Sequence, residues 1–95
     1  MKSLRIRLTP EAARLFSKLH PEGKKLIKSA LQELLLAPYS GHDLQEELSG
    51  FKSYRSKRYR LLYRVNEEKQ VIEVYYIGHR KDIHEQFKRL LNQLT

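Results

Sequence analysis

The first residues of the chain alternate between apolar and charged side chains. Leu4, Ile6 and Leu8 are separated by Arg5 and Arg7. A period of two is typical of a strand that buries one face. We therefore expect the chain to begin with a half-buried strand.

Two amphipathic helices are predicted to follow this strand. Thr9 is a favoured N-cap residue and Pro10 suits the first helical position, so the first helix is expected to start there. His20 should end that helix, because the residue before a proline such as Pro21 avoids the helical region. The apolar stripes recur at helical spacing, with Ala12, Leu15, Phe16 and Leu19 in the first helix and Leu26, Ile27, Ala30, Leu31, Leu34 and Leu35 in the second.

The middle of the chain is predicted to form strands joined by short turns. The run 71–77 is the most β-prone of the sequence and is expected to be a central strand that ends at Gly78. Consecutive strands joined by short turns should pair antiparallel. The expected order is a loop over 38–42, a connection that closes at 48–50, a strand from Phe51, a hairpin turn at 56–58, a strand over 59–65 and a polar turn at 66–69.

A final helix completes the predicted fold. Asp82 and Glu85 are spaced as in a capping box, and an apolar face follows. The element order β-α-α-β-β-β-α predicts an α+β fold in which a helical hairpin packs on a small, mainly antiparallel sheet. With 95 residues, we expect a single domain over residues 1–95. The apolar residues of the last helix are Ile83, Phe87, Leu90, Leu91 and Leu94.

Charge and composition narrow the class of protein. The formal net charge of +8 favours a polyanionic partner. The chain has no cysteine, which excludes disulfides, zinc–thiolate sites and a cysteine nucleophile. It also lacks the apolar run of a signal peptide and the ~20 apolar residues of a membrane span. We therefore expect a soluble, cytoplasmic protein with no membrane partner.

Basic residues concentrate between positions 51 and 66, where no acidic residue occurs. Guanidinium groups bind phosphates through paired hydrogen bonds, and tyrosine rings stack on unpaired bases, so the segment suits nucleic acid. The alternative is a solvated edge hairpin, whose charges prevent sheet-to-sheet aggregation and whose tyrosines are core residues. Composition alone leaves RNA, DNA and an acidic protein open as partners. The residues concerned are Lys52, Arg55, Lys57, Arg58, Arg60 and Arg64, with Tyr54, Tyr59 and Tyr63 between them.

His84 is a candidate for proton transfer. It falls in the first turn of the predicted last helix, where the positive end of the helix dipole, Arg80 and Lys81 disfavour imidazolium. A neutral imidazole can act as a general base, although an exposed histidine without a role fits the same pattern. No phosphate-binding glycine loop, zinc motif or acidic magnesium cluster is evident. Cleavage of a phosphodiester would therefore proceed without metal or cofactor, by attack of the ribose 2′-OH.

Several motifs together resemble the RelE/ParE toxin superfamily. They are Leu48-Ser49-Gly50, Tyr54-Arg55, the YRLLYRV run at 59–65 and the IGHRKDI run at 77–83. The resemblance covers nearly the whole chain and implies the toxin of a type II toxin–antitoxin pair. RelE-like members cleave mRNA in the ribosomal A site, whereas ParE-like members inhibit DNA gyrase.

The resemblance also implies roles for particular residues. Arg60 and Arg80 match arginines that contact mRNA phosphates in RelE-like members, and His84 stands where many relatives have a catalytic tyrosine. Phe51 and Ser53 occupy the positions nearest to a lysine pair of RelE, and Gln86 or Phe87 the position of its late tyrosine. The expected catalytic residues are Arg60, Arg80 and His84, and the expected RNA-binding residues are Lys52, Arg55, Lys57, Arg58, Tyr59 and Lys81.

Three functions remain open on the sequence. The first is a ribosome-dependent, metal-independent mRNA endoribonuclease that inhibits translation. The second is a gyrase inhibitor of ParE type without nuclease activity. The third is an inactive member that only binds its antitoxin. All three imply a cognate antitoxin as partner, and operator DNA would be bound only through the complex with that antitoxin.

Overall fold

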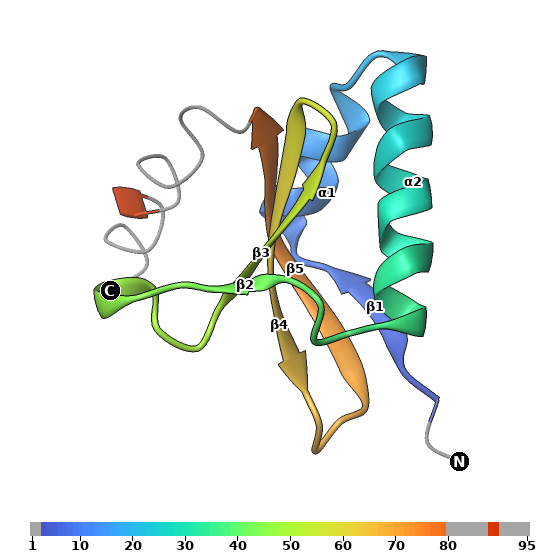
Figure 1. Cartoon of the computed structure of the whole chain (residues 1–95). Helices are drawn as coiled ribbons and strands as arrows, with labels where there is room; N and C mark the ends of the chain where they lie inside the picture. Colours follow the sequence, from blue (N-terminus) through green and yellow to red (C-terminus); the bar gives the residue numbers. More distant parts are fainter. Residues whose placement is uncertain (1–2, 80–87, 90–95) are drawn as a thin grey trace.

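The computed structural model describes residues 3–79 and 88–89. Its five-stranded sheet has the order β1-β5-β4-β3-β2, in which β1 runs parallel to β5 and the other pairs are antiparallel. Two helices pack on one face of the sheet, so the predicted α+β fold is confirmed (Figure 1). The elements are β1 Arg5–Leu8, α1 Pro10–Ser17, α2 Pro21–Leu36, β2 His42–Asp43, the 3-10 turn η1 Glu46–Leu48, β3 Lys52–Ser56, β4 Tyr59–Asn66 and β5 Val71–His79.

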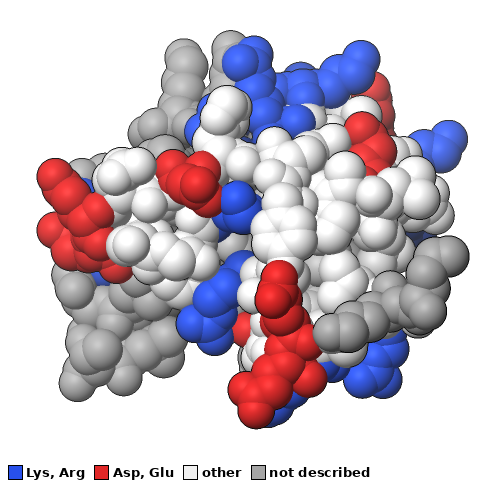
Figure 2. Space-filling model, turned by 60° about the horizontal axis from the view of Figure 1, so that its bottom comes forward, with Lys and Arg blue, Asp and Glu red and all other residues white. Residues whose placement is uncertain are grey.

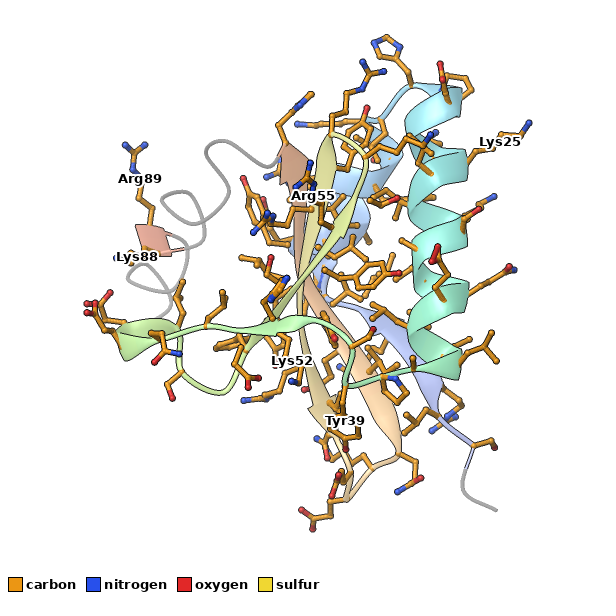
Figure 3. All side chains as sticks on the ribbon, viewed as in Figure 1. Lys25, Tyr39, Lys52, Arg55, Lys88 and Arg89 are labelled. Carbon is orange, nitrogen blue, oxygen red and sulfur yellow. The ribbon has the colours of Figure 1, made fainter. Side chains whose placement is uncertain are left out.

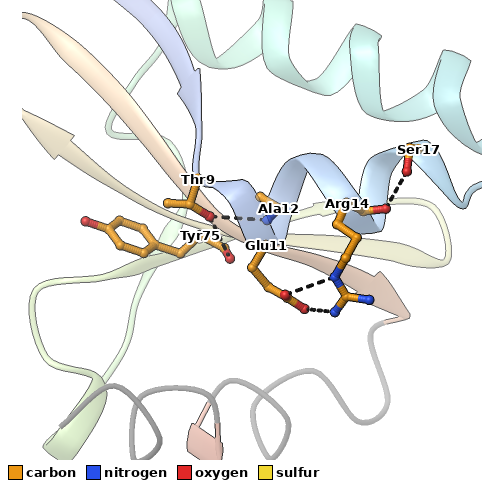
Figure 4. Close-up of polar contacts among 6 residues, drawn as sticks. All are labelled: Thr9, Glu11, Ala12, Arg14, Ser17 and Tyr75. Atoms are coloured by element: carbon orange, nitrogen blue, oxygen red, sulfur yellow. Dashed lines mark hydrogen bonds and ion pairs between the residues drawn. The ribbon is translucent and has the colours of Figure 1, made fainter.

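The start of α1 follows the predicted capping. Thr9 has extended backbone angles, and its hydroxyl accepts a hydrogen bond of 3.2 Å from the Ala12 amide (Figure 4). The Thr9 amide donates to the carbonyl of Val74, 3.0 Å away, which ties the helix start to β5. Glu11 lies in the first turn and pairs with Arg14, as the helix dipole favours for an acidic residue. Helix α2 begins at Pro21, directly after the break expected at His20.

The main core lies between the helices and the sheet. Ile27, Ala30 and Leu34 of α2 are fully buried against strand residues such as Leu61 and Ile72. Because side chains alternate along a strand, every second residue of β4 and β1 points to these helices. The other residues point to the opposite side, here called the outer face.

The outer face carries a second, smaller apolar cluster. Leu62 of β4 and Tyr76 of β5 are buried there together with Leu48, the last residue of η1. The register slips between Leu62 and Tyr63, so that Tyr75 is an extra residue in β5 and both Tyr75 and Tyr76 join this cluster. The chain that carries η1 runs on the side of the sheet away from α2 (Figure 1).

Tyr63 fixes the connection between α2 and β2. Its hydroxyl donates to the carbonyl of Pro38 at 2.9 Å and accepts from the Gly41 amide at 3.1 Å. A Cβ on Gly41 would lie 2.6 Å from that hydroxyl, so glycine is needed for this approach. The side chain is fully buried, and burial raises the pKa of Tyr63.

Two boundaries differ from the prediction. Strand β5 does not end at Gly78: it continues through His79, because Gly78 and His79 pair with Arg60 and Tyr59 of β4. His42 lies in β2 and not in a loop, because it pairs with Ser53 at the edge of the sheet. The predicted C-terminal helix falls mostly on residues outside the described ranges.

Candidate functional site

Arg60 is the central feature of the outer face. It is a half-buried residue of β4, and its Nη1 donates a hydrogen bond of 3.1 Å to the hydroxyl of Ser53 on β3. Its Nε is buried and has no hydrogen-bond partner among the residues that the structure describes. A buried charged donor without a partner is costly, and an oxyanion would remove that cost. The geometry therefore suits the binding of an anion.

A second arginine stands directly beside Arg60. Arg55 of β3 is its register partner in the antiparallel pair, and the side chain of Arg55 is exposed. On its other side Arg60 pairs with Gly78 of β5. A Cβ on Gly78 would lie 3.2 Å from the ring of Tyr76, so a larger residue at this position would crowd that ring. The structure thus brings together two of the predicted cations, Arg55 and Arg60.

Lys52 does not join these two arginines. It is the register partner of Tyr63, so it points to the helix-covered face of the sheet. Its ammonium group lies 2.7 Å from a carboxylate oxygen of Asp43 and 5.8 Å from the centre of the Tyr39 ring. Figure 3 shows Lys52 beside Tyr39 and well apart from Arg55. Lys52, expected to bind RNA, therefore lies on the opposite face of the sheet from Arg55 and Arg60, and its charge is engaged by Asp43; its contact with RNA stays a prediction.

Tyr59, which was expected to bind RNA, lies in the core. Its side chain is only 6% exposed and belongs to the core beneath the helices. The phenol ring lies 5.2 Å from the His79 ring. A buried ring has no free face for a nucleotide base, so the core alternative considered for the tyrosines holds for Tyr59.

The remaining predicted residues fall in two groups. Lys57 and Arg58 form the exposed turn between β3 and β4, at the same end of the sheet as Arg55 and Arg60. The Arg58 guanidinium carbon lies 5.8 Å from the Tyr59 ring centre. Arg80, Lys81 and His84 lie outside the described residues, so their predicted roles stay predictions.

Arg64 belongs to a separate cluster further along β4. Its Nη2 donates to Glu73 at 3.2 Å and to the Tyr75 hydroxyl at 2.9 Å. Its guanidinium carbon lies 5.6 Å from the Phe51 ring centre and 5.5 Å from that of Tyr75. Glu73 is also the register partner of Arg7 on β1. Arg64 is therefore paired with an acidic residue, whereas no acidic partner of Arg60 is found within residues 3–79 and 88–89.

Sequence reasoning did not select Ser53, although a signal for it exists. Ser53 and Arg55 are two residues apart on one strand, and two residues of that spacing share a face. The alternation along β3 therefore places Ser53 with the arginines and Lys52 away from them. Its side chain is 1% exposed, which makes it the buried polar residue beside Arg60.

Charge is mixed on other parts of the surface. On the face seen in Figure 2, basic side chains lie in separate groups, with acidic side chains and a broad uncharged area between them.

Within residues 3–79 and 88–89, no group of three or more His, Asp or Glu side chains could hold a metal ion. None of the described helices is long and apolar enough to cross a membrane.

Known proteins share both the sequence and the fold. Residues 6–84 match the family described as the ParE toxin of type II toxin–antitoxin system, parDE. Toxin RelG of Mycobacterium tuberculosis is 35% identical over 81 residues, which cover 83% of this chain and 93% of that protein.

Two solved structures illustrate the similarity of fold. The toxin–antitoxin complex RelBE2 of Mycobacterium tuberculosis matches with a TM-score of 0.74 and 32% identity, over 82% of this chain and 99% of that chain. A mutant of the Escherichia coli toxin RelE in the free state matches with a TM-score of 0.77 and 21% identity over 100% of both chains. With its helical hairpin on a mainly antiparallel sheet, the chain belongs to the RelE/ParE superfamily of type II toxin–antitoxin toxins.

Proposed function

We propose that this toxin is a ribosome-dependent mRNA endoribonuclease that inhibits translation and needs no metal ion for cleavage. The observation that carries the proposal is Arg60, a half-buried residue whose buried Nε has no hydrogen-bond partner in the described part of the chain and which stands beside a second arginine, Arg55. Such a pair suits a phosphate in a partly desolvated site, where hydrogen bonds to a developing charge are strong. The similarity to RelG and to the toxin of RelBE2 supports the RelE-like form of the activity.

The proposed reaction is an internal transfer at the phosphate of RNA. The ribose 2′-oxygen forms a bond to the adjacent phosphorus while the bond from phosphorus to the 5′-oxygen breaks. A base takes the 2′-hydroxyl proton, and an acid gives a proton to the leaving 5′-oxygen. The products are a cyclic phosphate and a free 5′-hydroxyl, so no water or cofactor is consumed.

Each cation has a distinct role in this proposal. Arg60 binds the scissile phosphate and stabilises the charge that develops on its oxygens. Arg55, Lys57 and Arg58 steer the RNA backbone toward it from the adjoining strand and turn. Arg80, Lys81 and His84 keep the roles that the family resemblance implies, with Arg80 on the phosphate, Lys81 on the RNA backbone and His84 as base or acid.

The proposed partners follow from the same surface. The ribosome supplies the mRNA in the cytoplasm, and a cognate antitoxin neutralises the toxin by covering the cationic part of the outer face. Solved relatives include toxin–antitoxin complexes, among them the RelBE complex of Escherichia coli. An acidic segment of the antitoxin would complement Arg55 and Arg60. Operator DNA would be bound only through that complex.

A second candidate function is inhibition of DNA gyrase. It is favoured by one observation, namely that the matching family is the ParE toxin. In that case Arg55 and Arg60 would bind an acidic surface of the gyrase complex and no chemistry would take place. An inactive protein that only binds its antitoxin is the remaining alternative.

Primer extension on a translated mRNA tests these functions. We expect new 5′ ends within codons after addition of the purified toxin, only when ribosomes are present, and unchanged by a chelator of transition metals. Magnesium is kept, because ribosomes need it. Absence of cleavage together with loss of gyrase supercoiling would replace the proposal by the second candidate, and absence of both effects would favour the inactive form.

A further inference from the structure

Within the described part of the chain, the side-chain hydrogen bond that holds Arg60 comes from one neutral residue, Ser53. Ser53 lies on β3 opposite Leu62, so Arg60 is its diagonal neighbour two residues along β4. That diagonal is within reach of a long side chain, and the hydroxyl of Ser53 accepts from Nη1 of Arg60 at 3.1 Å. Ser53 is 1% exposed, so water does not compete effectively for this contact.

The contact engages one particular part of the guanidinium. A guanidinium presents one pair of donors at its end, Nη1 with Nη2, and another pair at its side, Nε with Nη2. Because Ser53 engages Nη1, the end pair is partly occupied. In the side pair, the buried Nε has no hydrogen-bond partner among the residues that the structure describes, so this side of the guanidinium suits a ligand.

We propose that Ser53 is a positioning residue that orients Arg60 so that its Nε and Nη2 bind one phosphate side-on. This inference deepens the proposed function and rests on Arg60 as the phosphate ligand. Ser53 does not touch the RNA. It fixes the rotation of the guanidinium plane, so that Nε and Nη2 can each donate to one of two oxygens of the same phosphate. A neutral hydroxyl does this without adding a charge beside Arg55 and Arg60.

Among the described residues, neither register partner of Arg60 offers its guanidinium an acceptor side chain. Arg55, its register partner, repels it. Gly78, its other register partner, has no side chain. Without the Ser53 hydroxyl the guanidinium would therefore turn toward solvent, and its average orientation would change.

The first test compares cleavage by purified full-length variants on ribosomes programmed with one mRNA. For Ser53→Ala we expect about a tenfold lower single-turnover rate at saturating ribosomes, as for a small misplacement of a group that stabilises the transition state. The ribosome concentration at half-saturation should change less than twofold. Ser56→Ala is the matched control, because Ser56 lies on the same strand and points to the other face.

Two isosteric variants separate the hydroxyl from the volume of the side chain. Ser53→Thr keeps the hydroxyl acceptor and should cleave at most of the wild-type rate. Ser53→Val has the shape of threonine without the hydroxyl and should be as slow as Ser53→Ala. Circular dichroism and thermal unfolding verify that each variant is folded. Equal rates for Thr and Val variants would overturn the inference, because the hydroxyl would then have no role of its own.

A binding measurement separates this inference from the proposed function. The Nε–H signal of Arg60 is followed by ¹⁵N NMR during titration with inorganic phosphate, and its absence from Arg60→Lys assigns it. We expect a saturable shift in the wild-type toxin and in Ser53→Thr, and an affinity at least several-fold weaker in Ser53→Ala. Phosphate binding without mRNA cleavage by the wild-type protein would reject the nuclease and retain the role of Ser53. Equal phosphate affinity of wild type and Ser53→Ala would reject that role.

Discussion

Arg55 and Arg60 are register partners across the β3–β4 pair, so two arginine side chains start from directly opposed positions on the outer face. Like charges at directly opposed positions of a sheet destabilise it. A pair of this kind is therefore expected where binding an anion compensates for the repulsion, which links stability to function at this site.

Replacing Arg55 should separate these two effects. We expect Arg55→Thr to raise the free energy of unfolding by about 0.5 kcal/mol, because the opposed charge is removed and threonine suits a strand. The same variant should cleave mRNA several-fold more slowly. Urea unfolding and the ribosome cleavage assay measure the two quantities, with Arg55→Lys as the charge-retaining control. A variant that is less stable and fully active would contradict the role given to the pair.

Lys57 adopts a backbone conformation that favours glycine. Its φ of 56° is in the left-handed region, and it starts the turn between β3 and β4. We expect Lys57→Gly to raise the free energy of unfolding by about 1 kcal/mol, because the clash of the Cβ in this region disappears. Arg58→Gly is the matched control: it removes the same charge from a residue without positive φ and should lower stability.

Both turn variants should weaken RNA binding alike. Each removes one positive charge from the turn, so the affinity for a single-stranded oligonucleotide should fall and depend less steeply on salt. Fluorescence anisotropy at several salt concentrations measures this. If neither variant changes the salt dependence, Lys57 and Arg58 do not steer RNA.

Tyr63 should contribute to stability through its hydroxyl. Tyr63→Phe leaves the carbonyl of Pro38 and the amide of Gly41 without their partner, which should cost about 1–3 kcal/mol. Tyr39→Phe is a suitable control, because that hydroxyl lies on an exposed ring and donates to the exposed carboxylate of Glu67. Urea unfolding of both variants gives the comparison, and equal losses would show that the connection before β2 does not depend on Tyr63.

Stability should also fall at alkaline pH. Burial raises the pKa of Tyr63, whereas a phenol in the unfolded chain titrates near 10. Above that pH the unfolded chain has released the proton while the folded protein retains it, so ionisation lowers the free energy of the unfolded state relative to the native state. The stabilisation is present below about pH 10 and is lost as pH rises toward the folded pKa.

Burial as the main cause is shared by three other tyrosines. Burial also raises the pKa values of Tyr54, Tyr75 and Tyr76. Urea midpoints between neutral pH and pH 11 should therefore decline steeply, and Tyr63→Phe should show a shallower decline than the wild type. An identical pH dependence of the two proteins would mean that Tyr63 does not titrate within this range.

Much of the fold could be predicted because its signals are local. The alternation at Leu4, Ile6 and Leu8, the Thr9 cap and the break before Pro21 each depend on neighbouring residues, and all three correspond to observed elements. Strand β2 is only two residues long and therefore has no periodicity to detect. The extension of β5 through His79 depends on pairing with Tyr59, which no local pattern encodes.

The candidate site was predicted in part. Arg55 and Arg60 were correctly placed on adjoining strands, but a count of basic residues does not distinguish the two faces of a sheet. The count of basic residues therefore groups Lys52 with Arg55 and Arg60 and omits Ser53. Alternation along β3 instead places Ser53 on the face of the two arginines and Lys52 on the opposite face. The engagement of Arg64 by Glu73 depends on the register of β4 and β5, which the sequence does not specify.

The most direct test of the nuclease proposal is the ribosome-dependent cleavage rate of Arg60→Lys and Arg60→Ala beside the wild-type toxin. Lysine keeps the charge and lacks the paired donors of a guanidinium. We predict that both variants fold and that both lose about 100- to 1000-fold in rate, as on removal of a group that binds the transition-state oxyanion. An Arg60→Lys or Arg60→Ala toxin that cleaves mRNA at the wild-type rate would contradict the account.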